Sequence, residues 1–191
     1  KFGHDKNASL SIDESSFLKK GKASVGVKRQ WSGRAGKVEN CQVAVFASLG
    51  HAERYSLIDF ELFLPEEWAK DPERCDKAKI PIEKRRYKAK WELALELVAR
   101  ARENKVRFGW VGVDSLYGHN NKFLNTLEDR GENFVADVRK DYKVWTCKPA
   151  VEIPVKAPDQ RGKTPIRLKL NKEKNKARLL KVADFVEENF E

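Results

Sequence analysis

The sequence of 191 residues contains no methionine and only three cysteines. Cys41, Cys75 and Cys147 are odd in number, far apart and outside any Cys-x-x-Cys or Cys/His pattern, so they predict neither a disulfide framework nor a zinc site. No apolar run approaches the roughly 18–20 residues that cross a bilayer, and residues 1–20 lack the apolar segment of a secretory signal. We therefore expect a soluble, cytoplasmic protein with no membrane partner. Because the chain begins at Lys1 and lacks methionine, we also expect a fragment of a longer protein.

Acidic residues are scarce in two segments of an otherwise mixed sequence. The chain has 39 Lys and Arg against 29 Asp and Glu, a formal charge of +10. Residues 19–37 hold seven Lys or Arg, no acid and several glycines, whereas residues 139–181 hold fourteen Lys or Arg against four acids. This uneven charge favours a polyanionic partner, nucleic acid before a membrane surface. For residues 19–37 a phosphate-tracking role and a merely solvated surface remain alternatives.

Hydrophobic periodicity predicts a mixed sheet with flanking helices, which is an α/β fold. Two helices are expected, at residues 90–103 and 120–130, and five strands, at 8–12, 41–48, 55–64, 107–113 and 133–138. The strand at 107–113 is apolar on both faces, which is typical of a central strand covered on both sides. Residues 65–89 are predicted to be a charged surface excursion with one short helix. A terminal helix is expected from about Lys176 to Asn189.

Two acids follow strand-like runs at equivalent positions. Asp13 ends the run Leu10-Ser-Ile12, and Asp114 ends the run Trp110-Val-Gly-Val113. If the two strands are neighbours, both carboxylates emerge at one edge of the sheet and could bind Mg²⁺-class ions for phosphodiester chemistry. The alternative is that each acid is an ordinary strand-end or turn residue.

Other polar residues are candidates for substrate contacts. Gln30, Trp31 and Tyr117 could hydrogen-bond to or stack on bases. His119 and Tyr117 could supply acid/base chemistry, or the Gly118 between them could simply form a turn into the next helix. The segment Arg161-Gly-Lys163 lacks the two-glycine frame of a phosphate loop, so nucleotide hydrolysis is not favoured.

Five collinear blocks within residues 8–140 resemble the DDE superfamily endonuclease domain of bacterial insertion-sequence transposases. The blocks are Ile12-Asp-Glu-Ser-Ser-Phe-Leu-Lys-Lys-Gly-Lys-Ala-Ser-Val-Gly-Val-Lys-Arg-Gln30, Gly36-Lys-Val-Glu-Asn-Cys-Gln-Val-Ala-Val45, Leu62-Phe-Leu-Pro-Glu-Glu-Trp68 with Asp71 and Arg74, Lys90-Trp-Glu-Leu-Ala-Leu-Glu96, and Gly109-Trp-Val-Gly-Val-Asp-Ser-Leu-Tyr-Gly118.

The resemblance implies a ribonuclease-H-like core at residues 1–140, followed by a basic connector at 141–191 that begins the family's insertion. It implies that Asp13 and Asp114 are the first two catalytic acids and hold Mg²⁺ or Mn²⁺. It also implies cleavage and strand transfer on double-stranded DNA at mobile-element ends, in a bacterial, nucleoid-associated setting and with a possible homodimer in the synaptic complex. The residues that we expect to contact DNA are Lys19, Lys20, Lys22, Lys28, Arg29, Gln30 and Tyr117.

The family's third acid, a Glu on a later helix, has no match in this sequence. We therefore expect a truncated core that is inactive alone. Two alternatives stay open: a non-catalytic DNA-binding protein derived from a transposase, and a structural fragment without DNA affinity.

Overall fold

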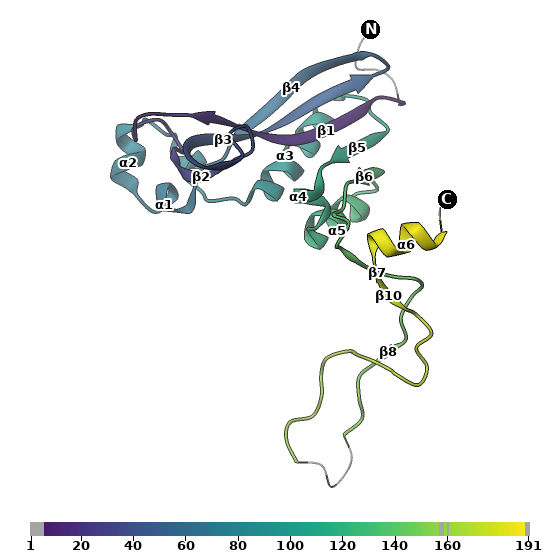
Figure 1. Cartoon of the computed structure of the whole chain (residues 1–191). Coiled ribbons are helices and arrows are strands. Elements are labelled where there is room, and N and C mark those ends of the chain that lie inside the picture. The colour runs from purple at the N-terminus through teal and green to yellow at the C-terminus, as the bar shows by residue number, and fades with distance from the viewer. Residues whose placement is uncertain (1–5, 157–158, 160, 190–191) are drawn as a thin grey trace. The chain divides into compact units, whose positions relative to one another are not determined.

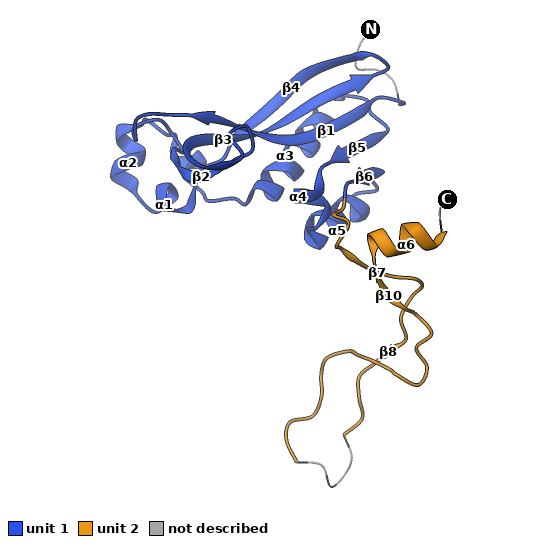
Figure 2. Cartoon of the chain, viewed as in Figure 1, with its two compact units in different colours: residues 1–137 blue, residues 138–191 orange. Residues whose placement is uncertain are grey.

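The computed structural model describes residues 6–156, 159 and 161–189. It divides the chain into two compact units, residues 1–137 and residues 138–191 (Figure 2). No helix in the described part of the chain is long and apolar enough to cross a membrane.

Unit 1 contains a six-stranded sheet and the helices that pack against it (Figure 1). Its strands are β1 (Ser9–Leu18), β2 (Lys28–Ser32), β3 (Lys37–His51), β4 (Arg54–Leu62), β5 (Trp110–Val113) and β6 (Phe134–Ala136). Its helices are α1 (Glu66–Ala69), α2 (Pro72–Lys77), the 3₁₀ helix η1 (Ile82–Lys84), α3 (Lys90–Glu103), α4 (Ser115–Gly118) and α5 (Asn121–Asp129).

The sheet is mixed, as the sequence predicts. Its strand order is β2–β3–β1–β5–β6, and β4 also pairs with β3. β1 and β3 are antiparallel, as are β2 and β3 and β3 and β4, whereas β5 runs parallel to both β1 and β6. This arrangement is compatible with a ribonuclease-H-like core.

β1 is longer than the expected strand at residues 8–12. It continues through Asp13 to Leu18, because β3 pairs with it along its whole length, from Ser9 opposite Gly50 to Leu18 opposite Cys41. A run of polar residues looks like a strand end when it is read alone. Here the long partner strand keeps those residues extended.

The helix α3 begins and ends where its periodicity predicts. The Glu92 carboxylate accepts the Ala89 backbone N–H at 2.7 Å and so closes the first turn. Leu93, Leu97 and Val98 of α3 are buried against the sheet.

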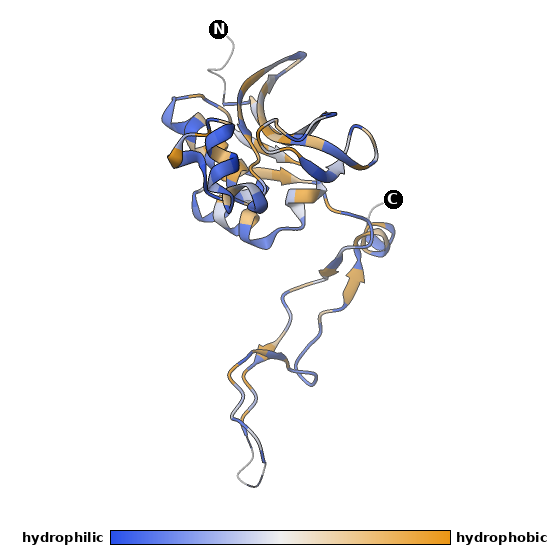
Figure 3. Cartoon of the chain, turned by 90° about the vertical axis from the view of Figure 1, so that its left-hand side faces the viewer, coloured by the Kyte–Doolittle hydropathy of each residue, from blue (hydrophilic) through white to orange (hydrophobic). Residues whose placement is uncertain are grey.

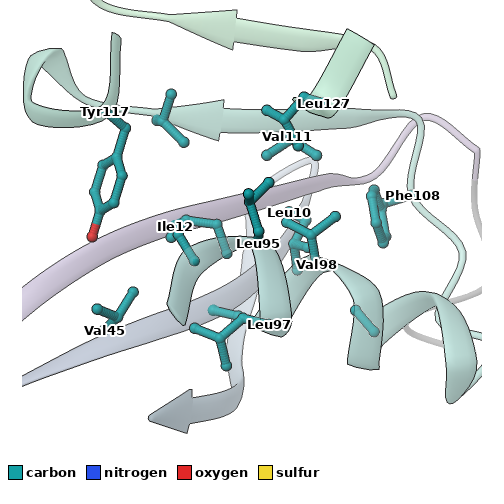
Figure 4. Close-up of a cluster of buried hydrophobic side chains, with 14 of the residues drawn as sticks. Leu10, Ile12, Val45, Leu95, Leu97, Val98, Phe108, Val111, Tyr117 and Leu127 are labelled. Carbon is teal, nitrogen blue, oxygen red and sulfur yellow. The ribbon is translucent and has the colours of Figure 1, made fainter. Parts of the chain in front are cut away.

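The main hydrophobic core lies between one face of the sheet and the helices α3 and α5. Figure 4 shows Leu95, Leu97 and Val98 of α3 facing the strand residues Leu10 and Ile12. The opposite face is not covered within the described residues: Trp110 of β5 is 49% exposed. The expectation that β5 is covered on both sides is therefore wrong. Its apolar outer residues lie on an open face.

The excursion at residues 65–89 has a small core of its own and forms α1, α2 and η1 rather than one short helix. Trp68 is buried, and its indole N–H donates to the Val27 carbonyl at 2.9 Å. The neighbouring Gly26 has φ +72°, and a Cβ there would lie 2.7 Å from the Phe63 carbonyl oxygen, so this position requires glycine.

Unit 2 is built from two short antiparallel strand pairs and one helix. β7 (Lys143–Trp145) pairs with β10 (Leu179–Lys181), and β8 (Val151–Glu152) pairs with β9 (Lys169–Leu170). The helix α6 (Val182–Asn189) begins later than the predicted Lys176, because Leu179–Lys181 pair with β7 as a strand. Figure 3 shows short hydrophobic stretches in this unit separated by hydrophilic segments, which agrees with its small buried area.

Candidate active site

Asp13 and Asp114 occupy neighbouring positions on two parallel strands. The pairing of β1 with β5 ends at Ile12 opposite Val113, and the two acids are the next residues on each strand. Both Ile12 and Val113 are buried in the core, so the residues that follow them point to the open face. The structure thus brings the two carboxylates together at the point where β5 ends.

The two acids influence each other electrostatically. Burial raises the pKa of Asp13, and the charges of Asp114 and Glu14 raise it further, against a hydrogen bond of 2.7 Å from the Glu14 backbone N–H. Within the described residues neither Asp13 nor Asp114 forms an ion pair with a Lys or Arg. Two neighbouring carboxylates that form no ion pair with a Lys or Arg favour a positively charged ligand between them.

Asp114 is held in place by the helix that follows it. Its Oδ1 accepts the Leu116 backbone N–H at 3.0 Å, which caps α4. α4 packs closely on the segment after β6. At Gly118 the two backbones are so close that a Cβ would collide with the Asp137 carbonyl oxygen. The short helix therefore anchors the backbone that carries Asp114.

On the core side of the sheet a second polar group supports the site. The Glu14 carboxylate forms an ion pair with Lys90 Nζ at 2.8 Å. It also accepts a hydrogen bond from the Tyr117 hydroxyl at 3.1 Å. These bonds connect β1, α3 and α4 behind the acids. Sequence reasoning did not find the role of Glu14 or Lys90, because the partners of Glu14 are distant in the chain.

Tyr117 is part of this supporting group and not of the exposed surface. Its side chain is 1% exposed and directed toward β1 (Figure 4). Burial, followed by the nearby Glu14 charge, raises the pKa of Tyr117 well above its ordinary value, so the hydroxyl stays protonated. The expectation that Tyr117 contacts DNA is corrected accordingly, since a ring enclosed in the core cannot stack on a base.

The predicted DNA-contact residues on the basic segment differ in their availability. Lys20, Lys22 and Arg29 are exposed, whereas Lys28 forms an ion pair with Glu67 at 3.0 Å. The Gln30 amide donates to the Cys41 carbonyl at 2.9 Å and so supports the strand pairing. The Lys19 carbonyl accepts the Asn40 amide at 2.7 Å, which shapes the loop before β2.

A hollow of about 300 Å³ opens beside the two acids. It is lined by Asp13, Glu14, Ser15, Ser16, Trp31, Gly33, Arg34, Val43 and Asp114. Arg34 was not selected as a DNA contact from the sequence. The pairing of β2 with β3 places it there, 21 residues after Asp13 in the chain.

The donor set fits a hard divalent cation. Carboxylate oxygens are preferred ligands of Mg²⁺ and Mn²⁺, which keep several waters and need few protein groups. No cluster of three or more His, Cys, Asp or Glu able to hold a metal occurs among the described residues. Asp13 and Asp114 could therefore hold an ion only in part, with the remaining positions left to water or substrate.

The fold and this pair of acids define a mixed α/β domain with a candidate nuclease-type site, and comparison with known proteins identifies the family. A family model described as DDE superfamily endonuclease matches residues 2–188, so the chain belongs to the DDE superfamily endonucleases. Members of this family generally use divalent metal ions.

The chain is also similar to a protein named "Probable transposase for insertion sequence element IS701" from Microchaete diplosiphon. The two are 29% identical over 136 residues, which cover 71% of this chain and 33% of that protein. The chain thus spans about a third of the length of this curated relative. No solved structure gives a significant match.

Proposed function

We propose that this chain forms part of a transposase catalytic core that cleaves DNA and transfers strands at the ends of a mobile element. The supporting observation is the register that makes Asp13 and Asp114 neighbours on parallel strands. Family membership and the transposase relative support the same reaction class.

In this proposal Asp13 and Asp114 are the catalytic acids and hold Mg²⁺ or Mn²⁺ through their carboxylate oxygens. A metal bound there would activate a water or a 3′-hydroxyl and stabilise the leaving oxygen of the phosphodiester. Asp114 stays oriented through its bond to Leu116 N–H, and Glu14 keeps β1 aligned through Lys90 and Tyr117. The backbone thereby holds both acids before substrate arrives.

Two acids without a third are a weak metal site. No group of three or more metal-binding side chains occurs in the described part of the chain, so we propose weak ion binding and little strand cleavage by this chain alone. A further acid would be needed to fix a second ion.

Double-stranded DNA, both element end and target, is the proposed partner. The exposed Lys20, Lys22 and Arg29 lie on the segment between the first acid and β3, where they can contact phosphates. We extend the proposal to Lys19, Lys28 and Gln30 of the same segment, to a homodimer in the synaptic complex, and to a cytoplasmic, nucleoid-associated location in a bacterium.

The test is Mn²⁺ binding by calorimetry to this chain, to the Asp13→Asn/Asp114→Asn variant and to the control Asp129→Asn. Asp129 is an exposed acid at the end of α5, so the control matches the loss of one charge. We expect binding to this chain and to Asp129→Asn and none to the double variant, with circular dichroism showing that all three fold. Equal or absent binding in all three would favour the alternative, a non-catalytic DNA-binding protein derived from a transposase.

A further inference from the structure

The hollow beside the acids has an aromatic wall. Trp31, at the end of β2, is 59% exposed and lines the same hollow as Asp13 and Asp114. A tryptophan of this exposure leaves a large apolar ring in water, which is unfavourable without a ligand. The hollow therefore offers a flat π surface close to the two carboxylates.

The position of Trp31 relative to the acids is set by a buried hydrogen bond. Ser16 Oγ and Ser32 Oγ lie 2.7 Å apart and are both buried. Ser16 is three residues after Asp13, and Ser32 directly follows Trp31. This bond joins β1 to β2 and keeps the indole at the hollow.

The turn after β2 adds a positive charge. Ser32 Oγ accepts the Ala35 backbone N–H at 3.2 Å, and Gly36 takes a positive φ of 63°, so the chain reverses within Gly33–Gly36. Arg34 lies in this turn and lines the hollow. Its guanidinium forms no ion pair with any acid in the described residues, and it is exposed.

These features together suit one nucleotide. An aromatic ring stacks on any base, an arginine binds phosphate, and a pair of carboxylates holding a cation receives the next phosphate. A hollow of about 300 Å³ is large enough to receive a single base.

We propose that Trp31 stacks on an unpaired nucleobase of the DNA strand whose phosphate lies at Asp13 and Asp114, and that Arg34 binds a neighbouring phosphate. The site would take a single-stranded end or a frayed terminal nucleotide. It rests on the proposed function, since it assumes DNA at the two acids.

The test compares a blunt DNA duplex with the same duplex carrying a short 3′ single-stranded extension that contains 2-aminopurine. Affinity and 2-aminopurine fluorescence are measured in Ca²⁺, which avoids cleavage. We expect this chain to bind the extended duplex more tightly and to quench the fluorescence by stacking. Trp31→Ala should lose about fivefold or more in affinity for the extended duplex and abolish the quenching, because stacking contributes about 1–3 kcal/mol per base.

Two further variants separate stacking from a folding defect. Trp31→Phe retains a ring and should restore most of the quenching. Tyr55→Ala removes an 85% exposed aromatic residue opposite Gly50, at the other end of β3 from the β2 pairing, and should change neither signal.

The outcomes distinguish this site from the proposed function. If this chain binds blunt DNA and Mn²⁺ but Trp31→Ala leaves the preference and the quenching unchanged, the nucleobase site is wrong and the proposed function stands. If this chain binds neither DNA nor Mn²⁺, both are wrong.

Discussion

The Tyr117 hydroxyl donates a 3.1 Å hydrogen bond to Glu14, a residue 103 positions earlier in the chain. Glu14 directly follows Asp13, and Tyr117 is the third residue after Asp114. One bond therefore connects the two backbone segments that carry the candidate catalytic acids.

Removing this hydrogen bond should weaken the site without creating a cavity in the core. Tyr117→Phe keeps the ring packed on Phe123 but leaves a Glu14 oxygen without its donor. We expect a loss of about 1–2 kcal/mol in the free energy of unfolding, measured with urea, and weaker Mn²⁺ binding. The exposed Tyr87→Phe is the control and should change neither. Equal behaviour of the two variants would show that the bond does not support the site.

In the absence of a cation, the ionised Asp13 side chain should lower the free energy of unfolding. Burial and the nearby Asp114 charge raise its pKa, so ionised Asp13 destabilises the fold as the pH rises from 3.8 through the raised folded-state value. We expect Asp13→Asn to increase the free energy of unfolding at neutral pH by on the order of 0.5 kcal/mol without metal, and to remove stabilisation by Mn²⁺.

The matched control for this variant is Asp59→Asn. Asp59 pairs with Arg100 at 2.9 Å, so its replacement should lower stability instead of raising it. Thermal unfolding with and without Mn²⁺ measures both. A destabilised Asp13→Asn would contradict the electrostatic argument.

The pH dependence of stability should include a contribution from Glu61. Burial alone would raise the pKa of Glu61, but bonds from Lys84 at 2.9 Å and Arg100 at 2.7 Å outweigh it and leave the pKa below 4.5. The ionised carboxylate therefore stabilises the fold above pH 4.5, and this contribution is lost as the pH falls through the lowered value.

Glu61→Gln should lower the free energy of unfolding at pH 7 by about 1 kcal/mol and flatten its decline below pH 4.5. Urea unfolding at several pH values measures this effect. The exposed Glu83→Gln serves as a control, and an acid-side slope that is the same in both variants would exclude Glu61 as its source.

Two glycines of the basic segment should differ in how much stability they lose on replacement by alanine. Gly26 has φ +72° and a Cβ there would lie 2.7 Å from Phe63 O, whereas a Cβ at Gly21 meets nothing within 4 Å. Gly26→Ala should cost about 1–3 kcal/mol and Gly21→Ala less than about 0.5, as measured by urea unfolding. Similar values for the two would mean that the 24–28 turn adapts freely.

Binding to duplex DNA should weaken steeply with salt. Each phosphate contact contributes about −0.9 to the slope of log affinity against log salt, so Lys20→Ala/Lys22→Ala should reduce the slope by up to about two. Lys122→Ala, on the exposed side of α5, is the control. An unchanged slope in the double variant would place the DNA elsewhere, and the absence of any affinity would favour a structural fragment.

Much of the fold could be predicted because its signals are local. The apolar stripe of α3 and the alternation in β3 and β4 arise from neighbouring residues, and these elements lie where they were expected. The predicted beginning of α6 was wrong because residues 179–181 pair with β7 as a strand instead of forming a helix. No local signal in the sequence reports that pairing.

The candidate site was predictable only in part, for a similar reason. The sequence picked out Asp13 and Asp114, yet their adjacency depended on whether two distant strands pair. Trp68 looked like part of a charged surface segment, and its burial follows from the contact with Val27. The expectation of DNA contact by Tyr117 failed because nothing in its neighbours reports the Glu14 partner.

The sequence by itself determined α3, α5, the approximate positions of β1, β3, β4, β5 and β6, the basic segments and the two acids, because periodicity, charge and motif are properties of neighbouring residues. The tertiary structure alone decided that β5 lies beside β1 and that Glu14, Lys90 and Tyr117 form one group. It also decided that Trp31 and Arg34 share a hollow with Asp13. These are contacts between residues far apart in the chain, which form only when the sheet and its helices pack together.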